Sequence, residues 1–483
     1  MDDSTLILAR QQEFRAGYRS WRMRGSRGAV GEVGLGQASG ETAGKSALLK
    51  GNISWRTGGA SGMKTTSTGS IGLNARPMSH GAAVEAASLG KNWLRFFLHP
   101  ESGFHRNASG GLSPCSLRAA NLPDIACNQS YKFDDSRIRI PAYERRLESF
   151  HSIICHIGVG GFFRSHQAVY THKLLLEPPA TEKGGDGKRW AYVGFGLMPW
   201  DEGMKKAMRT QDCLYTVMGR SPDTTEGMVV GSMVDFVYAP EDESGQSAIE
   251  RLAHPTTKIV SLTITEKGYC LTVDGQLDLN NSLIKHDLEN PASRPHSAAG
   301  IIVKALRLRR LRGVGPFTVL SCDNLPGNGS LTKAMISGFL DGLCSRYGNY
   351  PWGEYYHLRS WIMSRVKFPN TMVDRITPAT KPVEIKDDFS DGIRKLVRET
   401  YGIEDQWPVI AEYFSQWVIE DDFVGNARPQ WHLLPDHQRA LLVKDVDAYE
   451  MMKLRLLNAG HSALSYVSYL IGMIIHLKFS LVD

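Results

Sequence analysis

The chain has 483 residues, 42% hydrophobic and 22% charged, a composition typical of globular proteins with a large core. Its net charge of +6 is confined to one part, because residues 1–140 hold 18 Lys and Arg against 10 Asp and Glu, whereas the remainder holds 38 against 40. This distribution argues against a uniformly basic binding domain, so we expect no nucleic-acid partner.

The seven cysteines are scattered, with no Cys-x-x-Cys pair and no zinc-site spacing. Such scatter is typical of reduced thiols in a cytoplasmic enzyme and predicts neither a disulfide framework nor a metal site. No segment reaches the roughly 18 apolar residues that span a bilayer. The nearest, residues 464–477, carries His476 and favours a buried core helix, so we expect no membrane partner.

Residues 1–137 are rich in Gly, Ser, Ala and Arg and show no sustained period of 2 or 3.6 residues. This composition predicts a disordered extension. Order is expected from residue 138 onward.

Between residues 138 and 446, apolar runs alternate with amphipathic stretches, which predicts an α/β fold with a Rossmann-type, doubly wound parallel sheet. The runs that predict strands are 152–157, 190–195, 258–264 and 317–321, and those that predict helices are 166–176 and 297–312. From about residue 447 the pattern is helical to residue 483.

The first expected strand runs into Gly158, Gly160 and Gly161, and a helix follows. This order is typical of a turn that places a dinucleotide pyrophosphate against backbone amides. Phe163 stands where the usual fingerprint has its third glycine, so a plain tight turn between strand and helix remains the alternative. Arg164 is expected either to contact phosphate or to cap a surface.

Asp201 follows the second expected strand, where an acid usually binds the ribose hydroxyls of NAD and repels the extra phosphate of NADP. Its spacing from Gly158 exceeds the usual 20 or so residues, so a helix-capping role remains open. Asn324 follows a later strand, at the edge where doubly wound folds bind ligands. Its amide could donate to an alkoxide oxygen, although Asp-Asn-Leu-Pro-Gly also suits an ordinary turn.

Residues 449–461 place four functional side chains on one arc if they form an α-helix. With Lys453 at zero and about 100° per residue, Glu450 lies near 60°, His461 near 80° and Asn458 near 140°. A buried Lys453 with a lowered pKa could take a hydroxyl proton, Asn458 could donate to the developing alkoxide, and His461 could orient the substrate. A solvated polar face is the alternative.

Six motifs resemble the mannitol 2-dehydrogenases, a family of long-chain polyol dehydrogenases, in order and spacing. They are residues 156–168, 261–269, 321–326, 368–378, 407–409 and 416–421. The resemblance covers roughly residues 138–477. It implies an NAD-dependent, reversible oxidation of a polyol such as mannitol to a ketose such as fructose, by a monomer without a catalytic metal. Arabinitol, sorbitol and fructuronate are substrates of close relatives.

The resemblance also implies residue roles. Lys453 matches the general base, Asn324 and Asn458 the paired oxyanion donors, His461 the orienting histidine, and Glu450 a carboxylate that passes the proton to solvent. The expected cofactor-binding residues are Gly158, Gly160, Gly161, Phe162, Arg164 and Asp201.

The chain differs from the family pattern in two respects. Residues 1–137 have no counterpart in the family pattern. Residues 447–483 resemble only the start of the family's helical substrate domain, so we expect a truncated α-helical domain. From the sequence we therefore expect the chain to be poorly soluble or inactive, and a dinucleotide-binding remnant is the alternative to an active enzyme.

Overall fold

The structure is a computed structural model that describes residues 114–130, 138–177, 189–220, 225–348, 353–435, 438–460, 462–463 and 466. Its centre is a five-stranded sheet of order β6-β3-β2-β7-β8, in which all neighbours are parallel. The strands are β2 (Ser152–Ile157), β3 (Trp190–Gly196), β6 (Met233–Tyr238), β7 (Thr257–Leu262) and β8 (Thr318–Ser321). All four predicted strands are therefore confirmed.

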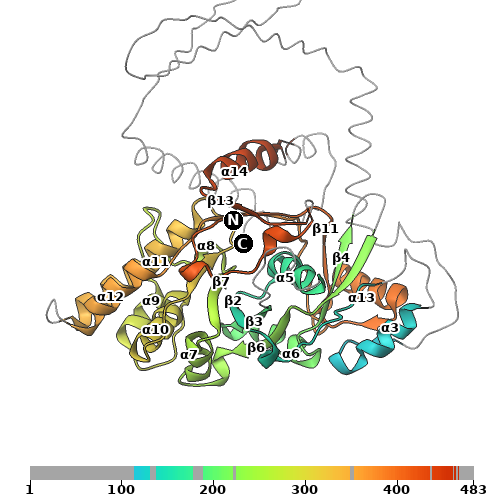
Figure 1. Cartoon of the computed structure of the whole chain (residues 1–483), viewed down its shortest axis with the longest axis horizontal. Helices are drawn as coiled ribbons and strands as arrows, with labels where there is room; N and C mark the ends of the chain where they lie inside the picture. Colours follow the sequence, from blue (N-terminus) through green and yellow to red (C-terminus); the bar gives the residue numbers. More distant parts are fainter. Residues whose placement is uncertain are drawn as a thin grey trace, which may run out of the picture. The chain divides into compact units, whose positions relative to one another are not determined.

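Strand β2 is buried along its whole length, and its side chains alternate between two hydrophobic clusters. Ile153 packs with the helices α7 (Gln246–Ala253) and α10 (Ala298–Leu311), whereas Ile154 packs with α5 (Gln167–Leu176). Figure 1 shows α7 and α10 on one side of the strands and α5 on the other. The doubly wound prediction is thus confirmed, with the strand order reversing between β2 and β7.

Smaller sheets surround this centre. One has the order β11-β4-β5, another β13-β12-β9, and β1 pairs with β10. Their strands are β1 (Cys115–Ser116), β4 (Tyr215–Arg220), β5 (Thr225–Val230), β9 (Thr371–Asp374), β10 (Ile403–Glu404), β11 (Val409–Glu412), β12 (Gln416–Glu420) and β13 (Leu441–Val443). The further helices are α3 (Leu122–Ser130), α4 (Gly161–Ser165), α6 (Glu202–Thr210), α8 (Thr265–Gly268), α9 (Ser282–Glu289), α11 (Asn328–Tyr347), α12 (Glu354–Arg365), α13 (Asp388–Tyr401) and α14 (Asp447–Met452).

The expectation of disorder up to residue 137 is wrong for residues 114–130. Strand β1 pairs in parallel with β10, and Leu117 and Ile125 are 1% exposed in a cluster with α13. Two apolar side chains in so short a segment leave no recognisable period, and several of their partners lie more than 250 residues further along the chain, in α13 and β10. The structure does not describe residues 1–113 or 131–137.

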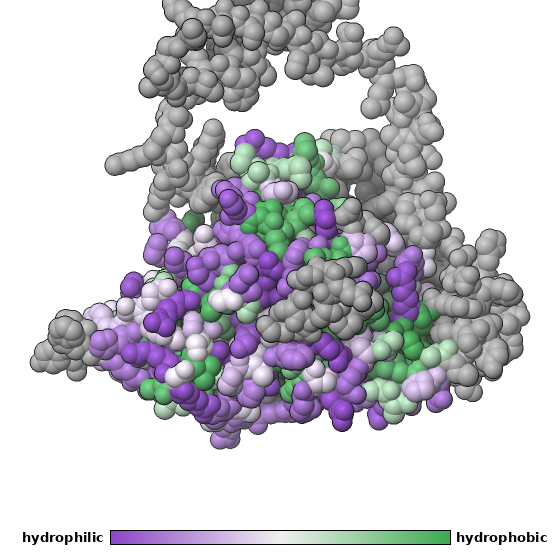
Figure 2. Space-filling view, in the orientation of Figure 1, coloured by the Kyte–Doolittle hydropathy of each residue, from purple (hydrophilic) through white to green (hydrophobic). Residues whose placement is uncertain are grey.

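The predicted helix from residue 447 is only partly regular. Helix α14 continues into a π-helix, η9 (Lys453–Asn458), and the residues after Gly460 are mostly outside the described part. Met451, Met452, Leu454 and Leu456 are exposed here, and Figure 2 shows hydrophobic surface where α14 lies in Figure 1. Among the described residues, no helix combines the length and apolar character that a membrane span requires.

The packing of α3 can be tested by truncating Ile125. We expect Ile125→Ala to lower the free energy of unfolding by about 2–4 kcal/mol, since truncating this buried side chain leaves a cavity in the core. Thermal unfolding followed by circular dichroism would measure the effect. Ala126→Ser, at an exposed position of the same helix, is the control and should leave Tm unchanged. Equal Tm values for both variants would show that α3 does not contribute to this core.

Candidate functional site

The glycine turn lies at the carboxyl end of β2, where the strand order reverses. Gly158 has φ +95°, and a Cβ placed on it would lie 2.0 Å from the carbonyl oxygen of Thr263. Only glycine fits this combination of left-handed backbone and close approach. A Cβ on Gly160 would meet nothing within 4 Å, so open space lies beside this residue. The turn thus combines a tightly packed inner side with an open outer side.

Gly161 and Phe162, two of the predicted cofactor-binding residues, are the first two residues of α4. The ring of Phe162 is partly buried and stacks on His166, with 4.9 Å between the ring centroids. Both residues therefore lie in the turn, and their contact with a cofactor remains a prediction.

Arg164 lies beneath the turn, not on its open side. Its side chain is 1% exposed, its guanidinium donates to the carbonyl oxygen of Trp407, and it packs over the ring of Tyr215. Burial lowers the pKa of Arg164 to about 10. Capping a surface is therefore excluded, and a phosphate contact would require the side chain to leave this interior position. In sequence, an arginine after a glycine turn gives no sign of which way it points.

Asp201 lies just after β3, the parallel neighbour of β2, and therefore at the same edge of the sheet as Gly158. Its carboxylate accepts a hydrogen bond from the backbone N–H of Met198 at 2.9 Å. Partial burial raises its pKa, and the backbone N–H groups of Met198 and Leu197 oppose that rise. The capping alternative is realised in this turn, while the ribose contact remains a prediction.

Lys453 is the centre of the second part of the site. Its Nζ donates to Oδ1 of Asn324 at 2.8 Å and to the carbonyl oxygen of Val373, and it lies 3.5 Å from Oδ1 of Asp374. The lysine is 8% exposed. Burial lowers its pKa below the ordinary value, and the charge of Asp374 opposes this shift. The lysine is therefore buried and lies in direct contact with Asn324.

Four of the predicted catalytic residues line a small cavity of about 40 Å³. They are Asn324, Glu450, Lys453 and Asn458. His461 lies outside the described residues. The α-helical angles predicted for this segment are wrong from Lys453 to Asn458, because these residues form a π-helix. A π-helix bonds residue i to residue i+5. Lys453 and Asn458, which are five residues apart, therefore lie closer to one face than they would in an α-helix.

Glu450 closes one side of this cavity. Both of its carboxylate oxygens lie within hydrogen-bonding distance of the Gly327 backbone N–H, at 3.2 and 3.3 Å. Burial raises the pKa of Glu450 to about 7, and the nearby charges of Asp447 and Glu420 act in the same direction. A carboxyl group with this pKa can both take up and release a proton near neutral pH.

Two carboxylates near Lys453 were not predicted. Asp374 ends β9, and Glu412 ends β11; burial raises the pKa of Glu412 to about 7. Asp374 lies within the family-like segment 368–378, and its place at a strand's carboxyl end is a signal that could have identified it. Glu412 also ends a strand but lies outside the family-like motifs, and its proximity to the site depends on β11 pairing with β4.

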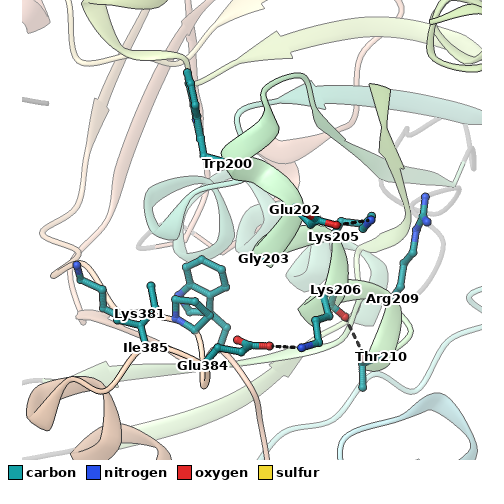
Figure 3. Close-up of a pocket in the computed structure, with 12 residues that line it drawn as sticks. Trp200, Glu202, Gly203, Lys205, Lys206, Arg209, Thr210, Lys381, Glu384 and Ile385 are labelled. Atoms are coloured by element: carbon teal, nitrogen blue, oxygen red, sulfur yellow. Dashed lines mark hydrogen bonds and ion pairs between the residues drawn. The ribbon is translucent and has the colours of Figure 1, made fainter. Parts of the chain in front are cut away.

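A larger cavity, of about 870 Å³, lies beside α6 rather than at Lys453. Figure 3 shows Lys206 of α6 paired across it with Glu384, a contact of 2.8 Å. Lys205 and Arg209 are paired with Glu241. Because acids already neutralise these cations, and none of the predicted catalytic residues lines the cavity, we place the candidate site in the smaller one.

His286, Asp287 and His296 form the one potential metal-binding group found among the described residues, although the sequence predicts no metal site. The two imidazole rings are stacked, 3.7 Å apart and 4° from parallel, so no single ion can lie in the plane of both. Asp287 instead accepts backbone N–H bonds from His296 and from Ser297 at the start of α10. The arrangement orders a loop, and the predicted absence of a catalytic metal remains a prediction.

Comparison with known proteins agrees with this geometry. A family model described as the mannitol dehydrogenase Rossmann domain matches residues 152–433, and one described as the mannitol dehydrogenase C-terminal domain matches residues 445–476. A mannitol dehydrogenase of Saccharomyces cerevisiae is 42% identical over 350 residues, 71% of this chain and 62% of that protein. The D-mannonate oxidoreductase of Escherichia coli is 43% identical over 68% of this chain and 60% of its own length.

A solved structure of Pseudomonas fluorescens mannitol 2-dehydrogenase, in a ternary complex with NAD and D-mannitol, is 37% identical with a TM-score of 0.60. The match covers 74% of this chain and 64% of that one. The chain thus spans less than two thirds of the length of these relatives. Because the Rossmann-domain model covers more than half of the chain, the chain belongs to the mannitol dehydrogenase family.

Proposed function

We propose that this chain binds NAD and oxidises a secondary hydroxyl of a polyol to a ketone, reversibly, with D-mannitol and D-fructose as the leading pair. The observation that carries the proposal is the buried contact between Lys453 and Asn324, at the same edge of the parallel sheet as the glycine turn. The relative solved with NAD and D-mannitol supports the choice of cofactor and substrate.

The glycine turn suits a dinucleotide. The open space beside Gly160 leaves room for a pyrophosphate, and Asp201 lies at the neighbouring strand end, where it would face ribose hydroxyls. Bound NAD would supply the acceptor for the hydride that leaves the polyol carbon. The other groups of the site then have to hold the substrate and move one proton.

Neutral Lys453 is the proposed base. An uncharged amine has two N–H groups and one lone pair, and two acceptors already face it, the carbonyl oxygens of Asn324 and Val373. With both N–H groups donated, the lone pair is left to take the hydroxyl proton. The carbonyl oxygen of Asn324 faces the lysine, which leaves its amide NH₂, with that of Asn458, to donate to the developing alkoxide.

Glu450 is proposed to pass the proton to solvent. It lines the same cavity as Lys453, is partly exposed, and has a pKa raised to about 7. His461 is proposed to orient the substrate. A monomeric state and a cytoplasmic location also belong to this proposal, and sedimentation of the purified chain tests the first of them.

A dinucleotide-binding chain without turnover is the second candidate. It is kept because the chain spans less than two thirds of its relatives' length, so turnover by this chain needs its own test. Arabinitol, sorbitol and fructuronate are the alternative substrates. The similarity to D-sorbitol dehydrogenase, at 33% identity, and to D-mannonate oxidoreductase favours including them in the assay.

Removal of the proposed base tests the function directly. NADH fluorescence titration combined with mannitol oxidation should show binding and turnover by the wild-type chain. Lys453→Met should retain NADH binding and lose at least about 100-fold in kcat, because general-base catalysis is removed. Lys444→Met, at an exposed lysine before α14, is the control and should keep full activity. Binding without turnover in the wild type would favour the second candidate, and the absence of NADH binding would contradict both.

The charge of Asp374 should set the pH dependence of oxidation. The base must be neutral, so the rate rises as pH rises through the pKa of Lys453. Burial lowers that pKa and Asp374 raises it, so Asp374→Asn should move the acid limb of log(kcat/KM) for mannitol to lower pH. Asp388→Asn, at an exposed position in α13, should leave the profile in place. A shift to higher pH would refute this assignment.

Two alanine substitutions separate the two sides of the glycine turn. Gly158→Ala should lower Tm, since its Cβ would collide with Thr263 in a left-handed backbone. Gly160→Ala should leave Tm unchanged, because its Cβ meets no atom within 4 Å, yet it should weaken NADH binding by filling the space for phosphate. Unimpaired NADH binding by Gly160→Ala would place the pyrophosphate elsewhere.

A further inference from the structure

His156 is the last histidine before the glycine turn, and it is completely buried. Its Nδ1 lies 2.8 Å from Oγ of Ser261, on β7. Its Nε2 lies 2.9 Å from Oγ1 of Thr263 and 3.2 Å from the carbonyl oxygen of Gly158. One imidazole ring thus connects β2, the residues at the end of β7, and the turn, across the point where the strand order reverses.

These contacts determine where the ring carries its proton. The carbonyl oxygen of Gly158 only accepts, so the N–H must be on Nε2, shared between Gly158 and Thr263. The Thr263 hydroxyl also donates to the same carbonyl, at 2.7 Å. Nδ1 is then bare and accepts from the Ser261 hydroxyl. Burial lowers the pKa of His156 to about 3, which keeps this neutral ring unchanged at neutral pH.

Three donors therefore meet at the Gly158 carbonyl: the His156 ring and the Thr263 hydroxyl from the interior, and the Gly160 N–H within the turn, at 2.8 Å. In a planar trans peptide, the N–H of the next residue points opposite to the C=O. The Val159 N–H is accordingly turned to the open side of the turn, and it makes no hydrogen bond to another residue in the described part of the chain. The left-handed φ of Gly158 permits this peptide orientation, and the space beside Gly160 lies on the open side.

We propose that His156 is a positioning residue for the cofactor. Through the Gly158 carbonyl, it fixes the Gly158–Val159 peptide so that the Val159 N–H donates to the pyrophosphate of the dinucleotide. Thr263 shares this role, and Ser261 holds the ring in the tautomer that the role requires. The inference rests on the proposed NAD-dependent function, and it adds an interior residue that never touches the cofactor.

Substitutions that separate the ring from its donor test the idea by NADH fluorescence titration. His156→Phe keeps a flat ring against Phe163, on which His156 stacks, but removes both hydrogen bonds. It should weaken NADH binding about tenfold, the effect of losing one well-placed hydrogen bond on an anion-binding peptide. His156→Gln places an amide NH₂ near the position of Nε2 and should restore most of the affinity. KM for NAD should follow these changes, while kcat and KM for mannitol stay within about twofold.

Thr263 provides a second, milder pair of variants. Thr263→Val removes one of the three donors to Gly158 without changing shape, and Thr263→Ser keeps it. The first should weaken NADH binding about threefold, and the second should bind like the wild type. This pair still tests the inference if His156→Phe does not fold.

His172→Gln is the matched control, since His172 on α5 is also buried, at 1% exposure, but its ring contacts Tyr143 and the Gly231 N–H and not the glycine turn. It should lower Tm without affecting NADH affinity. The inference is overturned if the folded His156→Phe and Thr263→Val variants bind NADH like the wild type, or if His172→Gln weakens binding equally. Failure of the wild type itself to bind NADH would instead overturn the proposed function.

Discussion

The parallel pairing of β6, β3, β2, β7 and β8 is the constraint on which the site depends. Parallel strands end at a common edge, so the loops that follow them are brought together whatever their separation in sequence. Gly158, Asp201, Thr263 and Asn324 each lie a few residues beyond one of these strands. Strand β9 and η9 then add Asp374 and Lys453 from segments that follow the sheet. The sheet thereby places a tight glycine turn and a buried amine at one edge.

The electrostatics of Lys453 follow from this placement. Removal from water favours the neutral amine, whereas the carboxylates of Asp374, Glu450 and Glu412 favour the ammonium. Burial is the larger effect, and the same burial raises the pKa of Glu450 and of Glu412 to about 7. Lowering the pKa of the amine and raising the pKa of the carboxyls brings their proton affinities closer together, which favours proton transfer between them.

The first strand, the glycine turn and the grouping of residues around Lys453 were predictable from sequence because they depend on local patterns. The run 152–157 is mostly apolar, which predicts a buried strand, and the glycines after it mark the turn. Grouping Lys453 with Glu450 and Asn458 needed only helical spacing. The rest depends on contacts between distant segments. The pairing of β1 with β10, the inward direction of Arg164 and the approach of Glu412 are set by packing, which a single sequence does not encode in any short window.

The π-helical turn from Lys453 to Asn458 has a consequence for how this segment tolerates change in length. A π-helix fits one more residue into a turn than an α-helix does, at the cost of poorer hydrogen bonding. Loss of a single residue such as the exposed Leu456 would let the segment revert to the more stable α-helix. Asn458 would then be the fourth residue after Lys453, about 40° around an α-helix from it, and would stay on the same face. The extra residue of the π-helical turn can therefore be lost without separating the side chains of Lys453 and Asn458.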